Sequence, residues 1–294
     1  MSGLRPVARV IRSQRMSEGG GFVVRRPFPL PGTDQIDPFL LLDEMGPVDY
    51  GPGQAVGAPD HPHRGFETVT YMLAGAVEHR DSTGASGVIM PGAVQWMTAG
   101  AGIVHSEMPP PSIRQFGGRV HGFQLWVNLR AAQKMVPPRY QGFEADELPT
   151  TPLFAGGSVR VIAGTVAGVT GPVQTASPVT YAHATLAPGD ELGWDLPPGH
   201  TALVHVFDGS ADVNGTDAGS GDLVVMEHLP GVIELSSASG AEVLLLAGEP
   251  LKEPIFRYGP FVMNTKAEIV QAFEDFEAGR LGSIPASGSG VHRD

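Results

Sequence analysis

The sequence predicts an all-β protein made of two β-barrel domains, with a short helix near the C-terminus. Three observations lead to this prediction. The 40 glycines and 27 prolines are spread along all 294 residues, a pattern that suits many short strands joined by turns and suits long helices badly. Short apolar runs bounded by turn residues recur throughout the chain. A weak internal repeat relates the first half of the chain to the second.

The short apolar runs have the length and composition of β-strands. They are rich in Val, Ile and aromatic residues, which pack well on a pleated surface. A first strand is also expected at Val7–Ile11, which has the same character. The other runs are Phe39–Leu42, Thr68–Leu73, Gly87–Met90, Gly122–Leu129, Val159–Ala163, Ala202–Phe207, Leu223–Met226 and Val243–Ala247.

The internal repeat consists of a strand, a glycine turn, a strand, a second glycine turn and a third strand. A duplicated β-barrel explains this order simply. The alternative is chance similarity between glycine-rich strands. The matched segments are Leu73–Val77, Pro91–Met97 and Gly102–His105 in the first half, and Phe207–Ala211, Gly221–Met226 and Gly231–Glu234 in the second.

The domain boundaries follow from length and from a change in composition. A chain of 294 residues is long enough for two domains, at about 150 residues each. The segment Asn128–Thr151 carries Pro137-Pro138, mixed charges and no sustained period, so it is interpreted as the connection. We therefore predict an N-terminal domain over residues 1–135, a linker over 136–150, a C-terminal domain over 151–282 and a flexible tail over 283–294.

One helix is expected near the C-terminus. Thr265-Lys266-Ala267-Glu268 has the form of a capping box, in which the first and fourth side chains satisfy free backbone N–H groups. Ile269, Phe273 and Phe276 follow at helical spacing, and Gly279 can end the helix.

Composition narrows the classes of function. The net charge of −12 repels phosphate backbones, which argues against direct nucleic-acid binding. The absence of cysteine excludes disulfides and zinc–thiolate sites. No apolar run approaches the ~20 residues of a membrane helix. The arginine-rich N-terminus could suggest a targeting peptide, but it lacks the apolar stretch of a secretory signal, so a cytoplasmic protein is expected.

Two short histidine motifs carry the chemistry. In a strand, residues i and i+2 point to the same face, so His61 and His63 can converge on one cation. Pro62 between them cannot donate a ladder hydrogen bond, which favours an edge strand or a strand start. His105 and Glu107 repeat the same spacing. Three imidazoles and one carboxylate with open coordination positions favour iron(II), with manganese, cobalt, nickel and copper as alternatives.

The acidic ligand has a second candidate on the residues alone. Glu67 lies four residues after His63 with the same strand parity, so it could reach the same face. The second half of the chain offers no comparable set. In the repeat register, Glu234 and Ser236 take the places of His105 and Glu107, and Asp195 and Pro197 are the ungapped counterparts of His61 and His63. No metal is therefore expected in the second barrel.

Longer stretches resemble the pirin family, a branch of the cupin superfamily. The resemblance covers nearly the whole chain. It implies two stacked cupin barrels of the jelly-roll type with a metal only in the N-terminal one, and it implies the ligands His61, His63, His105 and Glu107, which ranks Glu107 above Glu67. The stretches are Asp60–Tyr71, Gln95–Gly100 with His105–Pro109, Asp37–Glu44, Gln124–Leu129 and Gly259–Thr265.

The resemblance implies activities from two classes. Some pirin-like proteins are dioxygenases of the quercetin 2,3-dioxygenase type, whose partners are a small phenolic substrate and dioxygen. In such an enzyme Glu107, or as second choice Glu67, is expected to act as general base. Other pirin-like proteins are metal-gated regulators that bind a transcription factor or a metabolic enzyme, and the acidic composition favours a protein partner over nucleic acid. A third alternative is a housekeeping enzyme with another phenolic or enolic substrate.

Overall fold

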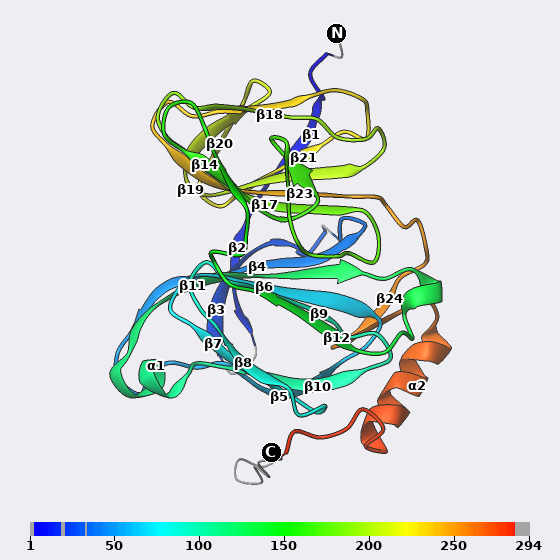
Figure 1. Ribbon diagram of the computed structural model, residues 1–294. Helices are drawn as coiled ribbons and strands as arrows, with labels where there is room; N and C mark the ends of the chain where they lie inside the picture. The colour runs from blue at the N-terminus through cyan, green and yellow to red at the C-terminus, as the bar shows by residue number, and fades with distance from the viewer. Residues whose placement is uncertain (1–2, 19–20, 33, 286–294) are drawn as a thin grey trace.

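The computed structural model describes residues 3–18, 21–32 and 34–285 and consists of two antiparallel β-barrels stacked on each other. Figure 1 shows the first barrel below, in blue and cyan, and the second above, in green and yellow. The predicted all-β fold with two stacked cupin-type barrels is confirmed. Among the described residues, no helix has the length and apolar character needed to cross a membrane.

The first barrel is formed by two antiparallel sheets. A four-stranded sheet has the order β5-β10-β7-β8, and a seven-stranded sheet has the order β12-β9-β6-β11-β4-β3-β2 within the described residues. The smaller sheet contains β5 (Ala58–His63), β10 (Ile103–Met108), β7 (Val77–Asp81) and β8 (Ser86–Ile89). The larger contains β12 (Arg139–Phe143), β9 (Val94–Thr98), β6 (Phe66–Ala74), β11 (Gly118–Asn128), β4 (Phe39–Tyr50), β3 (Phe22–Phe28) and β2 (Gln14–Glu18).

The second barrel repeats this plan. Its main path has the order β1-β21-β19-β23-β17-β14-β13, and β18, β22 and β20 complete it on the other side. The strands are β1 (Val7–Arg12), β21 (Asp222–Met226), β19 (Thr201–Val213), β23 (Ala241–Gly248), β17 (Val179–Leu186), β14 (Ser158–Ala163), β13 (Thr150–Pro152), β18 (Glu191–Trp194), β22 (Ile233–Ser236) and β20 (Thr216–Gly219). A small hairpin of β15 (Thr165–Val166) and β16 (Val169–Thr170) is attached.

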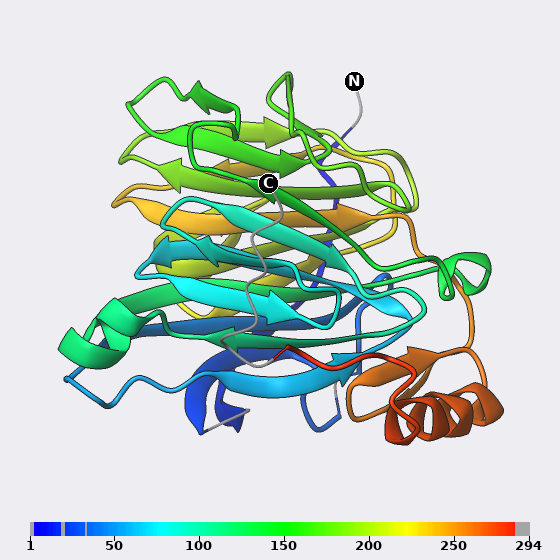
Figure 2. The same cartoon turned by 60° about the horizontal axis from the view of Figure 1, so that its bottom comes forward.

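The two ends of the chain are exchanged between the barrels. Strand β1 pairs with β21 of the second barrel, although the predicted N-terminal domain over residues 1–135 includes it. In return, the hairpin of β24 (Phe256–Tyr258) and β25 (Phe261–Met263) packs with helix α2 (Lys266–Glu277) against the first barrel. In Figure 2 the red segment after α2 runs across the first barrel, and Ser82 there donates to the carbonyl of Leu281 at 2.8 Å.

The connection between the barrels also differs from the predicted linker. Arg139–Phe143, inside the segment 136–150, forms β12 and pairs with β9 of the first barrel. Two short helical pieces, α1 (Pro111–Phe116) and the 3-10 turn Ala131–Gln133, are additional to the prediction. Of the predicted tail over 283–294, residues 286–294 lie outside the described residues.

The helix predicted near the C-terminus is confirmed as α2. The Thr265 hydroxyl accepts a hydrogen bond from the backbone N–H of Glu268 at 3.2 Å, as in a capping box. The helix ends at Glu277, and Gly279 has a φ of +71°. Such a left-handed residue after the last turn suits glycine.

The largest apolar cluster lies between the two barrels. It joins Trp96 and Phe123 of the first barrel to Tyr181 and Leu246 of the second, all fully buried. Burial of one large apolar side chain contributes about 1.5–3 kcal/mol, so this cluster holds the barrels together. The interior of the second barrel is a separate apolar cluster that includes Trp194. The interior of the first barrel is different, because histidines occupy part of it.

Candidate metal centre

The first barrel brings His61, His63 and His105 together on two paired strands. Strand β5 pairs with β10 so that His105 lies opposite His61, and Ile103 lies opposite His63. Strand β5 is at the end of its sheet. Pro62 thus lies in an edge strand, as predicted, where its missing N–H does not break a ladder.

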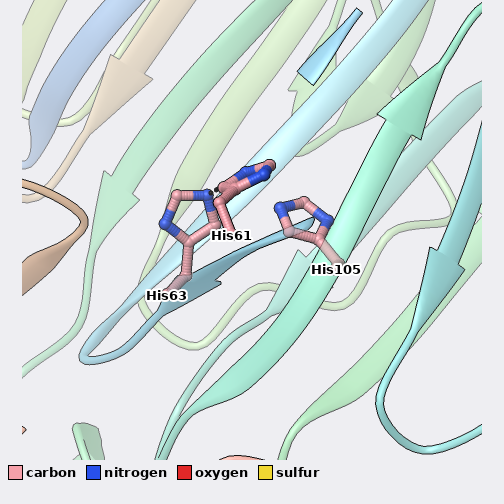
Figure 3. A group of neighbouring side chains, drawn as sticks. All are labelled: His61, His63 and His105. Carbon is pink, nitrogen blue, oxygen red and sulfur yellow. Dashed lines mark hydrogen bonds between the residues drawn. The ribbon is translucent and has the colours of Figure 1, made fainter. Parts of the chain in front are cut away.

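The three imidazoles point toward one another, as Figure 3 shows. Each offers one nitrogen, and these nitrogens all lie within 4.8 Å of one another. The ring centroids are 4.7 Å apart for His61 and His63, 4.3 Å for His61 and His105, and 5.0 Å for His63 and His105. Three nitrogens at these separations can share one cation at ordinary ligand distances of about 2.0–2.2 Å with small side-chain adjustment.

The hydrogen bonds of His61 and His63 leave their inner nitrogens as acceptors. The Nδ1 of His61 lies 2.7 Å from the carbonyl oxygen of Pro59, and the Nδ1 of His63 lies 3.3 Å from that of Pro260. A carbonyl oxygen can only accept, so each neutral imidazole carries its proton on Nδ1. The two Nε2 atoms then face each other across 3.1 Å with a lone pair on each. A cation between them removes this repulsion.

His105 gives a second indication that the centre suits a metal. Its side chain is 1% exposed, and neither ring nitrogen has a hydrogen-bond partner among the described residues. Burial, the largest cause, lowers the pKa of His105 and of His63 well below the ordinary value. Both imidazoles are therefore neutral, which is the form that ligates a metal. A buried polar group without a partner is costly, and a metal bond would satisfy it.

Glu107 lines the same cavity as His61 and His63. Its Oε1 accepts a hydrogen bond from the Thr70 hydroxyl at 2.7 Å. The pairing of β10 with β5 is irregular between His105 and Glu107, so that Glu107 lies opposite Ala58. Glu107 is outside the group of three whose ligand atoms lie within 4.8 Å. A fourth ligand role would fall to the carboxylate oxygen that Thr70 does not hold.

Glu67 does not point to the same face as His63, contrary to what strand alternation in the sequence predicts. Gly65, between β5 and β6, has a φ of +88°, and this turn reverses the alternation of side chains. The ring of Phe66 consequently contacts His63, with centroids 5.1 Å apart. Glu67 lies on the opposite face of β6, where it accepts a hydrogen bond from the Thr98 hydroxyl at 2.7 Å. Burial raises the pKa of Glu67.

The turn at Gly65 is held by a buried lysine. A Cβ atom on Gly65 would lie 2.0 Å from the carbonyl oxygen of Val262, so this position requires glycine. The Lys134 ammonium donates to the carbonyls of Gly65 and Val262 and to the side chain of Asn128. Burial lowers the pKa of Lys134 to about 8. These bonds hold the turn that follows β5 and thereby fix the position of His63 at the end of that strand.

The centre opens into a cavity of about 510 Å³. The C-terminal hairpin forms part of its wall through Arg257 and Pro260. Neither residue is among the site residues predicted from the sequence, although Pro260 lies in the stretch Gly259–Thr265 that carries the family resemblance. Trp126 contacts residues of both the first barrel and the C-terminal hairpin. Its ring centroid is 5.1 Å from that of His63 and 4.6 Å from the guanidinium carbon of Arg257.

His79 is a further buried histidine close to the centre. It lies opposite Glu107 in the β7–β10 pair and is 1% exposed. Its ring centroid is 5.7 Å from that of His105, and its Nε2 is 3.5 Å from a carboxylate oxygen of Asp81. Burial lowers the pKa of His79, and the charges of Glu107 and Asp81 oppose that shift. His79 therefore adds a polar group behind His105.

The corresponding strands of the second barrel carry apolar side chains inward. Strands β18 and β22 pair as β5 and β10 do, and Leu192, Trp194, Ile233 and Leu235 fill the interior. Glu234, the counterpart of His105 in the sequence repeat, faces outward. A difference of one residue in register moves a side chain to the other face. The expected counterparts Asp195 and Pro197 lie beyond the end of β18.

The fold and the three convergent imidazoles define this protein as a bicupin with a candidate metal centre in its first barrel. The sequence profile of the Pirin family matches residues 21–127, and that of the Pirin C-terminal cupin domain matches residues 181–282. The chain belongs to the pirin family, as the resemblance predicted.

Relatives and solved structures extend this comparison over the full length. The chain is 43% identical over 288 residues to a pirin-like protein of Caulobacter vibrioides, covering 95% of this chain and 99% of that protein. It is 46% identical over 266 residues to a Pseudomonas aeruginosa protein named "Putative quercetin 2,3-dioxygenase", covering 90% of this chain and 93% of the other. A crystal structure of quercetin 2,3-dioxygenase from Acinetobacter baumannii has a TM-score of 0.91 and 40% identity, covering 96% of this chain and all of that one.

Proposed function

We propose that this protein is a metal-dependent dioxygenase of the quercetin 2,3-dioxygenase type, which cleaves a flavonol-like substrate with dioxygen and whose native metal is iron(II). The observation that carries the proposal is the pair of facing Nε2 atoms of His61 and His63, 3.1 Å apart, at the wall of a cavity of about 510 Å³. Names of similar proteins support the same reaction class.

The metal ligands in this proposal are His61, His63, His105 and Glu107. Bound there, a divalent ion would act as a Lewis acid that lowers the pKa of a coordinated substrate hydroxyl. The backbone carbonyls of Pro59 and Pro260 hold the tautomers of His61 and His63, so the ligand nitrogens stay aimed inward.

Glu107 is proposed as the general base that takes the proton of the substrate hydroxyl. Its carboxylate lines the metal cavity and also a smaller, mostly apolar cavity next to it. The Thr70 hydroxyl holds one carboxylate oxygen, which leaves the other free to accept a proton. Glu67 was the second choice for this role, but its carboxylate lies on the other face of β6.

The cavity supplies orientation and exclusion of water. Trp126 and Phe22 offer flat apolar surface to a planar ring, and Gln124 offers a polar group beside Glu107. The adjoining apolar cavity extends past Glu107 between Val48, Val77 and Val120. An aromatic substrate with vicinal oxygens at one end fits this division between a polar and an apolar end.

The test is turnover after defined metal loading. The protein is loaded anaerobically with iron, manganese, cobalt, nickel or copper, and quercetin and oxygen are then added. Loss of the flavonol absorbance together with release of carbon monoxide is the expected result, and His105→Ala should abolish both. The matched control is His228→Ala, on the exposed surface of the second barrel. No substrate loss with any of the five metals would end this proposal.

One contact favours the alternative function of a metal-gated regulator. His63 is bonded to the carbonyl of Pro260, in the segment that leads into α2 at the surface. A change at the metal could therefore reach a partner surface through this segment. Hydrogen exchange of residues 256–277 with and without metal tests this link, and identical exchange in both states would remove it.

A further inference from the structure

Arg257 lies in the metal cavity although it belongs to the C-terminal segment. It is on β24, in the hairpin that packs against the first barrel, and it lines the same cavity as His61 and His63. Its guanidinium carbon lies 4.6 Å from the ring centroid of Trp126, a distance at which a cation is attracted to the ring face. This stacking fixes the position of the guanidinium.

Among the described residues Arg257 forms no close ion pair, although the charges of Glu18 and Asp43 act on it at longer range. A second cavity arginine, Arg26, is fully paired, with both oxygens of Asp43 at 2.6 Å and with Glu18 at 2.7 Å. By contrast, within the part of the chain that the structure describes, Arg257 has no carboxylate partner within 4.0 Å. Its hydrogen bond there is a long one, 3.4 Å, to the carbonyl of Leu40. An arginine beside an apolar ring that lacks a close carboxylate partner has N–H groups available to a ligand.

The position of Arg257 relative to the imidazoles suggests what it would bind. The Trp126 ring contacts both His63 and Arg257. A ligand on the metal that lies along this indole would therefore meet the guanidinium with its far end. A guanidinium binds carboxylates and other flat oxyanions in preference to neutral groups, because its N–H groups match them in geometry and charge.

We propose that Arg257 is a specificity residue that selects planar aromatic ligands carrying an acidic group, a carboxylate or an ionised hydroxyl, in addition to the oxygens that bind the metal. The inference rests on the metal cavity of the proposed function, but it concerns binding and needs no turnover. It predicts a substrate with an acidic group at the end away from the metal.

Two small ligands test the proposal directly. Catechol and 3,4-dihydroxybenzoate have the same metal-binding hydroxyls and differ by one carboxylate. Each is titrated anaerobically into the nickel-loaded protein. Nickel is chosen because nickel(II) does not oxidise the catechol. Tryptophan fluorescence reports binding, because Trp126 lies in the cavity, and calorimetry gives the dissociation constant.

The wild-type protein should bind 3,4-dihydroxybenzoate about tenfold more tightly than catechol, as expected for one charge-assisted hydrogen-bonded pair. Arg257→Gln should abolish this preference and leave catechol binding within about twofold of wild type. Arg257→Lys should keep part of the preference, since it retains the charge without the planar fork. Arg119→Gln, an exposed arginine away from this cavity, is the matched control and should change neither constant.

Three results would overturn the proposal. They are equal affinity of wild type for the two ligands, equal weakening of both by Arg257→Gln, and no binding of either ligand to the nickel-loaded protein. If Arg257→Gln does not fold, the lysine variant and the loss of wild-type preference at high salt decide the question. Failure of quercetin turnover with the preference intact would reject the dioxygenase and leave the role of Arg257 standing.

Discussion

Arg64, which directly follows His63 at the end of β5, donates to a carboxylate oxygen of Asp275 in helix α2 at 2.7 Å. The same arginine donates to the carbonyl of Ala101 at 2.6 Å, in the loop before β10. One side chain thus ties together the two strands that carry the histidines and the helix that covers them. The helix therefore helps to hold the candidate metal centre in place.

Replacement of Asp275 by asparagine should loosen α2 and weaken metal binding without removing a ligand. The hydrogen bonds from Arg64, Gln271 and Arg280 lower the pKa of Asp275 to about 2. A carboxyl whose folded pKa is depressed contributes stability above its unfolded pKa, about 3.9, and loses it as the pH falls toward 2. Thermal melts from pH 7 to pH 2 should show a loss in wild type that Asp275→Asn lacks. Identical acid profiles would contradict this role.

Replacement of His105 by alanine should abolish metal binding and leave the fold intact. His105 supplies one of three convergent nitrogens, and with two imidazoles the centre loses its defined geometry. Elemental analysis after loading should give about one metal ion per chain for wild type and nearly none for the variant. His228→Ala should load like wild type. If the His105→Ala variant still bound one metal ion per chain, the metal would have to bind elsewhere in the protein.

Replacement of Thr70 by valine should lower turnover about tenfold while the metal content stays unchanged. Valine has the shape of threonine but cannot donate to Glu107, so the proposed base loses the bond that positions it. The effect should fall mainly on kcat, with KM nearly constant. Thr70→Ser, which keeps the hydroxyl, should restore most of the rate. Equal losses in the valine and serine variants would point to packing instead.

Replacement of Glu44 by glutamine should weaken the contact between the two barrels and lower the free energy of unfolding by about 3 kcal/mol. Glu44 is fully buried and accepts two hydrogen bonds from Arg25, at 2.7 and 2.8 Å, while Arg25 also donates to Phe207 of the second barrel. Burial raises the pKa of Glu44, but the hydrogen bond with His121 at 3.0 Å, the His205 imidazole 3.8 Å away and the charge of Arg25 outweigh it, and the pKa is about 2.

The pH dependence of this contribution follows from the depressed pKa. The stabilisation from Glu44 is present above about pH 4.3, the unfolded value, and is lost as the pH falls toward 2. Urea unfolding at pH 7 and pH 3 measures it. The matched control is Asp49→Asn, whose exposed pair with Arg119 should contribute at most about 1 kcal/mol. A Glu44→Gln variant as stable as wild type at pH 7 would contradict the prediction.

The sequence by itself determined the class of fold and three residues of the candidate centre. Both follow from short-range rules, because strand alternation places His61 beside His63 and the glycine and proline turns mark the ends of strands. The capping box at Thr265 is equally local, and helix α2 begins there. In these cases the deciding physics acts within a few residues along the chain, whereas His105 reaches the other two histidines through the pairing of β10 with β5.

Only the tertiary structure decided which distant segments complete the centre. The packing of the C-terminal hairpin on the first barrel brings Arg257 and Pro260 to the histidines, nearly 200 residues away in sequence. The turn at Gly65 turns Glu67 away, because one left-handed residue shifts the alternation by one position. Such outcomes depend on how strands pack against each other and on single-residue register, and no local pattern in the sequence encodes either.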